Sequence, residues 1–487
     1  MEGDVKFLHD LGGFVCLLSG VTLVISSYEL GRQPQSVAEV QNLVESLGHR
    51  VSVLDLSLPD DMDRQLHQAS NDLGWPEGSY ADLTKAFADT DLFLLSTPML
   101  TAATMAKRLV KAISKANPVA KIAAFGLYSD IVLTDSVPHI DAAMTGEYLP
   151  LIEEWLAAGL PSNHRATSNR PSRHSANTVI ERTSLPPISA YPEIVVGGVH
   201  KLVGHVESTR GCRHSCLHCP VPTAYHGRIQ INPVDTILTD IRGLIDQGAT
   251  HITFGDPDFL NAPIHASKIV EGLDALSSEE ISFDATIKVE HILKYPSLIE
   301  KMAALGCSMI TSAVESLNDE VLSRLDKGHT AEQAYEATEI VQKLGITLHP
   351  SFLPFTPWTT NRDLADIVDY CYHFGLEEVV EPVQFGIRLL LPPGSLLLSS
   401  ENRDFEILDY DPTTMGYRWQ HSDRRIDELA IKVASLAEEA TYAKQSNLET
   451  LHAIRHIAYQ FIDKVPPAIT RGTTILSSTK LAEPWFC

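Results

Sequence analysis

Short β-branched runs alternate with longer stretches of helical periodicity over the first third of the chain. The strand-like runs are residues 21–26, 51–54, 91–96 and 121–126, and the helical stretches between them are residues 36–47 and 102–116. Runs of this length indicate strands, whereas apolar positions that recur every three or four residues indicate amphipathic helices. Strands alternating with helices form a parallel sheet covered on both faces. The pattern predicts an α/β domain, Rossmann-like or flavodoxin-like, over residues 1–160.

The same alternation returns after residue 200, behind a polar and basic stretch that predicts a linker over residues 161–197. The expected strands beyond it are residues 202–208, 251–254, 283–288, 309–313, 347–353 and 383–390, with helices between them such as residues 233–247 and 298–305. Six such units predict a partial (β/α)6 TIM-like barrel over residues 198–400, with its chemistry at the carboxyl ends of the strands. Helical periodicity over residues 424–443 and 447–461 then predicts a mainly helical C-terminal segment with a tail, residues 401–487.

Composition narrows the class of protein. The 487 residues carry a formal net charge of −24, and an acidic surface repels phosphate backbones, so we expect no broad nucleic-acid binding. The longest apolar stretch, residues 14–25, contains Ser19 and Gly20 and is shorter than the ~20 residues of a membrane span. It also follows an acidic start, unlike a signal peptide. We therefore expect a cytoplasmic protein without a membrane partner.

Cysteines carry the strongest chemical signal. Seven cysteines in so long a chain do not form a disulfide framework, but Cys212, Cys216 and Cys219 cluster with the spacing C-x3-C-x2-C. A loop this tight can turn three thiolates toward one iron–sulfur cube and leave one iron open. The alternative is a structural zinc site completed by His214 or His218, which would make the chain a zinc-stabilised binding protein rather than an enzyme.

The cysteine motif, directly after the first expected barrel strand, resembles that of the radical S-adenosylmethionine (SAM) superfamily. The resemblance implies a [4Fe–4S] cluster on the three cysteines, with SAM bound to the open iron. It also implies an electron donor such as flavodoxin or ferredoxin, and cleavage of a carbon–sulfur bond of SAM to start radical chemistry on a small molecule or peptide. One departure is His218, which stands where the family usually has Phe or Tyr.

The resemblance further implies SAM contacts at the ends of the next strands. The implied residues are Gly255, Asp256, Asp258, Lys288, Glu290, Glu315, Ser316 and Arg388. The first three occupy the place of a glycine-rich motif that meets the SAM amino group, and Lys288 and Glu290 would face its carboxylate and ribose. Glu315 and Ser316 begin a stretch similar to ES…DEVL…KGHT, and Arg388 would reach the carboxylate or the substrate. The alternative for each is a helix cap or a solvated surface charge.

An α/β domain ahead of such a barrel resembles the cobalamin-binding arm of B12-dependent members. Many of these arms carry D-x-H-x-x-G after the first strand, with the histidine as the cobalt ligand. Aligned on Gly31, this chain has Ser26 and Tyr28 in place of the Asp and His. Histidine-ligated cobalamin is therefore disfavoured, while cobalamin without a protein ligand and a domain that has lost the cofactor both remain open.

The whole chain also resembles a narrower group, the radical SAM proteins with a C-terminal CUAEP or CCAEP tail, which implies a role in specialised metabolism. The matching stretches are residues 27–34, 252–259, 283–291 and 354–360. The tail keeps Ala-Glu-Pro at residues 482–484 but loses the preceding pair, so Cys487 is its only thiol. Cys487 is a candidate cluster ligand or nucleophile, and the alternative is a free residue at a frayed end.

A second enzyme hypothesis comes from a similarly built group that makes arsinothricin-type compounds. That resemblance implies transfer of the 3-amino-3-carboxypropyl group of SAM to a soft acceptor such as trivalent arsenic. Soft acceptors are captured by thiolates, and a single tail cysteine makes the capture weak. The SAM fragment distinguishes the two enzyme hypotheses, because radical cleavage releases 5′-deoxyadenosine and aminocarboxypropyl transfer releases 5′-methylthioadenosine.

Overall fold

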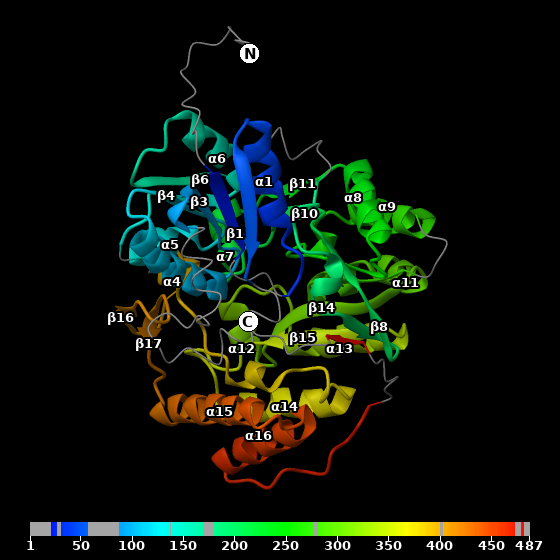
Figure 1. The fold of residues 1–487 in the computed structure, drawn as a ribbon. Coiled ribbons are helices and arrows are strands. Elements are labelled where there is room, and N and C mark those ends of the chain that lie inside the picture. The colour runs from blue at the N-terminus through cyan, green and yellow to red at the C-terminus, as the bar shows by residue number, and fades with distance from the viewer. Residues whose placement is uncertain are drawn as a thin grey trace, which may run out of the picture.

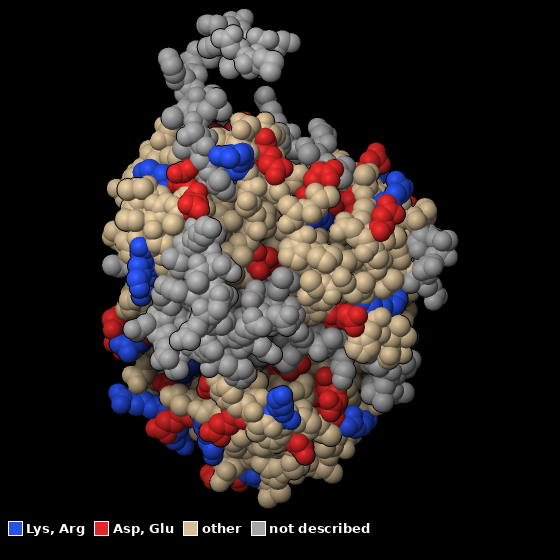
Figure 2. All heavy atoms as spheres, viewed as in Figure 1, with Lys and Arg blue, Asp and Glu red and all other residues tan. Residues whose placement is uncertain are grey.

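A computed structural model describes residues 21–26, 31–56, 87–136, 138–168, 180–276, 281–399, 403–472 and 479–481. Two parallel sheets form its framework, one from the N-terminal part and one from the middle of the chain, and two long C-terminal helices lie at the far end from the first sheet (Figure 1). No helix within these residues is long and apolar enough to cross a membrane. Acidic and basic side chains are interspersed over the described part of the face in Figure 2.

The first sheet has six parallel strands in the order β2-β1-β3-β4-β5-β6. The strands are β1 (Val21–Ser26), β2 (Arg50–Asp55), β3 (Thr90–Ser96), β4 (Lys121–Phe125), β5 (Ala142–Gly146) and β6 (His164–Ser168). Helices α1 (Gln35–Ser46) and α6 (Tyr148–Ala157) pack on one face, and α4 (Leu100–Ala116) and α5 (Ser129–Asp135) on the other. Successive strand residues point to opposite faces, so Val24 joins one core and Ile25 the other. The predicted doubly covered α/β domain is confirmed.

Strand β6 is a difference from the predicted organisation, because it lies inside the expected linker. His164–Ser168 pairs in parallel with β5 and extends the first sheet. It forms an outer strand whose side chains are exposed or half-buried. Edge strands are often polar for this reason, and their composition resembles that of a linker.

The second sheet has five parallel strands in the order β15-β14-β13-β12-β9. They are β9 (Val203–Val206), β12 (His251–Phe254), β13 (Ser282–Thr286), β14 (Cys307–Glu315) and β15 (Thr347–Phe352). The helices along this region are α8 (Val234–Asp246), α9 (Pro263–Leu276), α10 (Val289–Lys294), α11 (Pro296–Ala304), α12 (Asp319–Arg324), α13 (Ala331–Lys343) and α14 (Asp363–Phe374). Apolar residues from these strands and helices form one large buried core. The predicted barrel is confirmed for its first five strands.

The expected sixth strand, residues 383–390, is wrong as a strand. The chain instead forms the 3₁₀ helix η3 (Pro382–Gly386), followed by a single parallel bridge between Phe355 and Arg388. A β-carbon on Gly386 would lie 2.8 Å from Ala434 Cα, so the chain packs directly against helix α15 (Arg424–Tyr442). A short apolar run does not by itself distinguish a strand from another buried segment.

The C-terminal segment is helical, as predicted, but it also contains strands. Helices α15 and α16 (Asn447–Phe461) pack on the second domain. The hairpin β16 (Ile407–Asp411) and β17 (Gly416–Trp419) contacts the first domain, where Lys107 Nζ donates to Pro412 O at 2.9 Å. Strand β18 (Lys480–Leu481) pairs with the hairpin of β7 (Ile194–Val196) and β8 (Val199–Lys201). The segment therefore contacts both domains.

A buried ion pair joins the segment after the first sheet to α8. Arg182 Nε and Nη2 donate to Asp240 Oδ1 and Oδ2 at 3.1 and 2.7 Å, and both side chains are buried. Removing one partner leaves a buried unpaired charge, so we expect Arg182→Met to lower the free energy of unfolding by about 3–5 kcal/mol. Urea denaturation of the metal-free protein measures it. The double variant Arg182→Met/Asp240→Leu should recover most of the loss, and a single-variant loss under about 1 kcal/mol would contradict the assignment.

Candidate active site

The loop that carries the three cysteines starts at the carboxyl end of β9. Strand β10 (Thr209–Gly211) pairs with β11 (Ile229–Ile231), and α7 (Pro220–Tyr225) begins directly after Cys219. Gly211 has φ +78°, and a β-carbon there would lie 2.4 Å from Arg228 O and 2.6 Å from the Tyr225 ring. Only glycine fits this position, so the chain can turn sharply into the cysteine loop.

The cysteine thiols are largely shielded from solvent, and two of them contact apolar side chains. Cys212 and Cys216 are buried, Cys219 is half-buried, and Cys212 and Cys219 contact the apolar cluster that α7 forms with Leu127 of the first domain. Burial raises the pKa of Cys212, and burial together with the neighbouring thiols raises the pKa of Cys219 to about 12. Thiolates at these positions therefore need a positively charged partner, such as bound iron.

The spacing of the sulfur atoms distinguishes between one metal ion and a larger cluster. Ligands of a single zinc ion lie roughly 4 Å apart, because Zn–S bonds are about 2.3 Å long. Across the described ranges, one group of His, Cys, Asp or Glu brings three ligand atoms within 4.8 Å of one another, and it contains none of the cysteines. The three sulfurs therefore do not surround one ion. A cube in which each sulfur binds a different iron does not require the three sulfurs to meet at one point.

A buried charged group lies against the cysteine loop. Lys327 Nζ and His218 Nε2 each lie 3.1 Å from Glu315 Oε1, and Glu315 adopts a left-handed conformation with φ +63°. Burial would raise the pKa of Glu315, but Lys327 and His218 outweigh it and hold that pKa well below its usual range. Glu315 is therefore an ionised carboxylate at neutral pH. Its partner His218 is the residue that departs from the family pattern.

Two more of the predicted residues lie beside the cysteines. Lys288 Nζ is 3.9 Å from Cys216 Sγ and 3.5 Å from Glu290 Oε2. Gly328, with φ +75°, passes so close that a β-carbon there would lie 2.9 Å from Glu290. The ends of β13 and β14 thus bring Lys288, Glu290 and Glu315 to one side of the cysteine loop. Ser316 is buried next to Glu315, and its hydroxyl accepts a hydrogen bond from Asn318 N at 3.1 Å in the turn before α12.

The two aspartates of the stretch after β12 are both buried among nearby polar groups. Asp256 accepts hydrogen bonds from Ser208 N, Ser208 Oγ and Thr209 Oγ1 at 2.9, 2.7 and 2.6 Å, and burial raises its pKa to about 6. It fixes the entry into the cysteine loop. Asp258 is buried against His214 and His291; burial would raise its pKa, but these histidines lower it to about 2. Their neighbour Gly255 lines a cavity.

One predicted residue, Arg388, is not brought to this place. Arg388 Nη1 donates to Asp427 Oδ1 at 2.7 Å, and the guanidinium lies 4.2 Å from the Trp419 ring centre. The bend at η3 directs Arg388 toward α15 and β17 instead of the cysteines. Cys487 lies outside the described residues.

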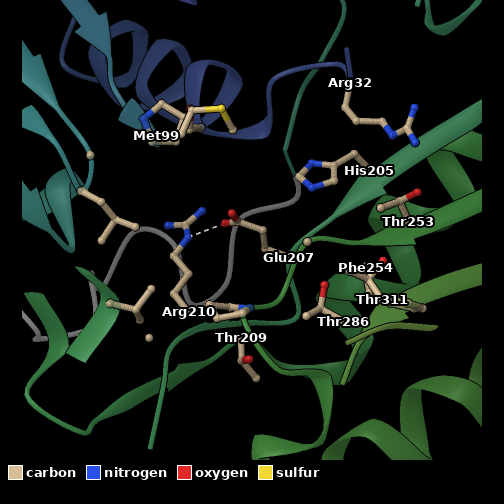
Figure 3. Close-up of a pocket in the computed structure, with 18 of the residues that line it drawn as sticks. Arg32, Met99, His205, Glu207, Thr209, Arg210, Thr253, Phe254, Thr286 and Thr311 are labelled. Carbon is tan, nitrogen blue, oxygen red and sulfur yellow. Dashed lines mark hydrogen bonds and ion pairs between the residues drawn. The ribbon is translucent and has the colours of Figure 1, made fainter. Parts of the chain in front are cut away.

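A cavity of about 450 Å³ lies between the carboxyl ends of the two sheets, next to the cysteine loop (Figure 3). The first domain contributes Met99, Leu127 and Tyr148 to its wall, and the second contributes Thr253, Thr286 and Thr311. A volume of this size suits a small organic ligand. The carboxyl edges of parallel sheets are where α/β proteins bind ligands, and here two such edges face each other.

A polar network crosses the cavity wall and was missed by sequence reasoning. Arg210 Nε donates to Glu207 Oε2 at 2.6 Å, as Figure 3 shows, and Arg210 also pairs with Glu39 of α1. Tyr148 OH donates to the same Glu39 at 2.9 Å. Burial together with Arg182 and Arg32 lowers the pKa of His205 to about 3, so this cavity residue is neutral. A charged pair three residues apart, directly before the cysteine motif, was the one sequence signal for this network.

Comparisons with known proteins agree with this geometry. A sequence profile described as the Radical SAM superfamily matches residues 206–371. The tRNA-2-methylthio-N(6)-dimethylallyladenosine synthase of Finegoldia magna is 25% identical over 201 residues, which is 38% of this chain and 42% of that protein. The bacteriochlorophyllide d C-12(1)-methyltransferase of Chlorobaculum tepidum is 26% identical over 133 residues, which is 27% and 28% of the two chains. The matches thus span less than half the length of these curated relatives.

Solved structures share the arrangement of both domains. OxsB, a cobalamin-dependent S-adenosylmethionine radical enzyme solved with aqua-cobalamin and S-adenosylmethionine bound, superposes with a TM-score of 0.64 at 13% identity, covering 92% of this chain and 72% of that one. TsrM from Kitasatospora setae, a radical S-adenosylmethionine methyltransferase, superposes with a TM-score of 0.56 at 16% identity, covering 78% and 75%. At these identities the likeness establishes the fold.

Proposed function

We propose that this chain is a radical SAM enzyme that cleaves SAM reductively and starts radical chemistry on a small molecule or peptide, because the Radical SAM superfamily profile matches residues 206–371. The observation that carries the proposal is the set of three cysteine thiols, two buried and one half-buried, which do not come together around one ion and lie in a loop whose flanking residues Gly211 and Val221 line the cavity between the two domains. A [4Fe–4S] cluster on Cys212, Cys216 and Cys219 would supply the electron that breaks a carbon–sulfur bond of SAM.

The surrounding side chains are suited to hold a zwitterionic co-substrate. The ammonium group of Lys288 can approach a carboxylate, and the ionised Glu315 can approach an ammonium group. Glu290 is the best placed acceptor for hydroxyl groups on this side of the loop, because a third of its side chain is exposed, at 36%. We assign the SAM amino acid moiety to Lys288 and Glu315, and the ribose to Glu290.

The cavity is the proposed substrate site. Its threonine hydroxyls and the Glu207–Arg210 pair offer hydrogen bonds, while Met99, Leu127 and Phe254 offer apolar surface. A cavity of about 450 Å³ admits a small molecule or a few residues of a peptide. An electron donor such as a flavodoxin or ferredoxin would reduce the cluster from outside.

The fragment released from SAM tests the proposal. The holoenzyme, reconstituted anaerobically with iron and sulfide, is incubated with SAM and dithionite, and the products are separated by mass spectrometry. We expect 5′-deoxyadenosine and methionine. Formation of 5′-methylthioadenosine instead would support aminocarboxypropyl transfer, and intact SAM beside a colourless protein would support the zinc-stabilised binding protein.

We further propose that the enzyme works without cobalamin, although OxsB and TsrM were solved with cobalamin bound. Ser26 ends β1 as a buried residue where the cobalamin arms carry aspartate, and Tyr28, outside the described residues, replaces the histidine. A corrinoid is also larger than the drug-sized ligands that a cavity of about 450 Å³ suits.

The corrinoid content of the purified protein shows whether the enzyme binds cobalamin or works without it. Protein produced in cells supplied with hydroxocobalamin should retain less than about 0.1 equivalent per chain, because non-covalent retention through purification requires submicromolar affinity. Mass spectrometry of the released cofactor measures it. Retention of one cobalamin per chain would reject this part of the proposal and leave the cysteine assignment intact.

A further inference from the structure

Three side chains of ligand type meet beside the cysteine loop. His214 lies in the loop between Cys212 and Cys216, Asp258 follows β12, and His291 lies in α10 after β13. One ligand atom from each lies within 4.8 Å of the other two. Asp258 has an exposed fraction of 0% and His291 one of 7%, so the group lies inside the protein. Solvent therefore cannot supply hydrogen-bond partners for all of it.

The orientation of these groups is the informative feature. His291 Nδ1 lies 2.7 Å from Asp258 Oδ2, and His214 Nε2 lies 3.4 Å from the same oxygen. Both distances would allow hydrogen bonds, yet all three atoms are buried without a hydrogen-bond partner, so neither ring nitrogen is aligned with the oxygen. Leaving buried polar atoms unpaired is costly. A cation bound among the three atoms would satisfy all of them at once.

We propose that His214, Asp258 and His291 bind one divalent first-row transition-metal ion, separate from the iron–sulfur cluster. Two imidazoles and one carboxylate are ligands that Zn²⁺ and Fe²⁺ accept, whereas Mg²⁺ and Ca²⁺ prefer oxygen ligands alone. Three protein ligands leave a coordination position for water. Glu290 Oε2 lies 3.7 Å from His214 Nδ1, on the far side of that ring, where it can orient the imidazole as an outer carboxylate does in many metal sites.

The place of the site suggests what the ion does. His214 belongs to the loop of Cys212 and Cys216, while Asp258 and His291 follow the ends of two sheet strands. A bound ion therefore ties the cysteine loop to β12 and β13. It would hold the loop in position whether or not the cluster is loaded, so the site does not depend on the proposed SAM chemistry.

Zinc binding by the cluster-loaded enzyme tests the proposal. Protein purified anaerobically is incubated with one equivalent of Zn²⁺ and desalted, and zinc, iron and acid-labile sulfide are measured. We expect one zinc per chain beside the full complement of cluster iron and sulfide. His291→Asn should bind zinc at least about 100-fold more weakly with unchanged iron and sulfide, because loss of a direct ligand exceeds the 10- to 100-fold effect of an outer-shell partner.

A matched control keeps the result specific. His226→Asn makes the same substitution at an exposed histidine just after α7, where φ +52° suits asparagine, and should retain zinc. Equal zinc binding by His291→Asn, or zinc bound only as iron is lost, would overturn the proposal. X-ray absorption at the zinc edge identifies the ligand atoms of zinc in the unaltered enzyme, so it does not depend on whether a variant folds. Nitrogen and oxygen ligands support the site, and sulfur ligands overturn it.

Discussion

Replacing Cys216 by alanine should abolish both the iron–sulfur cluster and SAM cleavage. Each cluster thiolate is expected to bind a different iron, so two remaining cysteines would leave two irons without protein ligands. We expect reductive cleavage to fall at least about 1,000-fold, which corresponds to more than about 4 kcal/mol in the barrier. Anaerobic reconstitution followed by iron and sulfide analysis and quantification of 5′-deoxyadenosine measures the effect.

The control for this prediction is another buried cysteine. Cys307 lies at the start of β14, where its thiol donates to Met309 O at 3.5 Å, far along the strand from Glu315. Cys307→Ala makes the same change and should keep iron, sulfide and cleavage. Full cluster content in Cys216→Ala, or loss of the cluster in Cys307→Ala alone, would reject the assignment of the cysteine loop.

Replacing Glu315 by glutamine should destabilise the protein strongly. Lys327 and Glu315 have side-chain exposed fractions of only 4% and 12%, and the substitution leaves the Lys327 ammonium buried without a counter-charge. Removing one partner of a buried pair costs about 3–5 kcal/mol. Urea denaturation of the cluster-free protein at neutral pH measures the free energy of unfolding, with Glu339→Gln, in the exposed pair with Lys343, as a control that should change it by less than about 1 kcal/mol.

A double variant and a pH series distinguish the loss of the Glu315–Lys327 ion pair from a general disruption of packing around residue 315. Glu315→Gln/Lys327→Met removes both charges and should recover most of the stability. The folded-state pKa of Glu315 is depressed, so its stabilising effect is present above the unfolded value of about 4.3 and is lost as pH falls toward the folded value. The stability difference between the parent and Glu315→Gln should therefore shrink below about pH 4. A constant difference would contradict the ion pair.

Much of the fold could be predicted because local pattern and tertiary structure agree. The runs that became β1 and β3 are buried on both faces, and α4 shows the periodicity of a helix with one buried side. The prediction of a strand over residues 383–390 was wrong because an apolar run indicates burial but not backbone conformation. Gly386 also allows a close contact with α15 that no local pattern reveals. Strand β6 was predicted as part of a linker because its side chains are polar, as expected for an outer position in the sheet.

The site was predictable where its residues share a local spacing or follow the ends of strands in one sheet, and not where two domains meet. The cysteine spacing predicted a cluster, which stays a prediction, and the strand ends correctly placed Lys288, Glu290 and Glu315 near the cysteine loop. The pair of Arg210 with Glu39 joins residues 171 positions apart in two domains, so no sequence pattern predicts it. Asp256 shows the opposite case: its position after a strand suggested a ligand contact, but its oxygens are used by Ser208 and Thr209.

Mössbauer spectroscopy of the ⁵⁷Fe-reconstituted enzyme, recorded with and without SAM, tests the central claim most directly. If three cysteines hold three corners of a [4Fe–4S] cube, SAM should change the signal of one iron in four and leave the other three unchanged. A spectrum without a four-iron cluster, or a four-iron cluster whose sites all ignore SAM, would contradict the account.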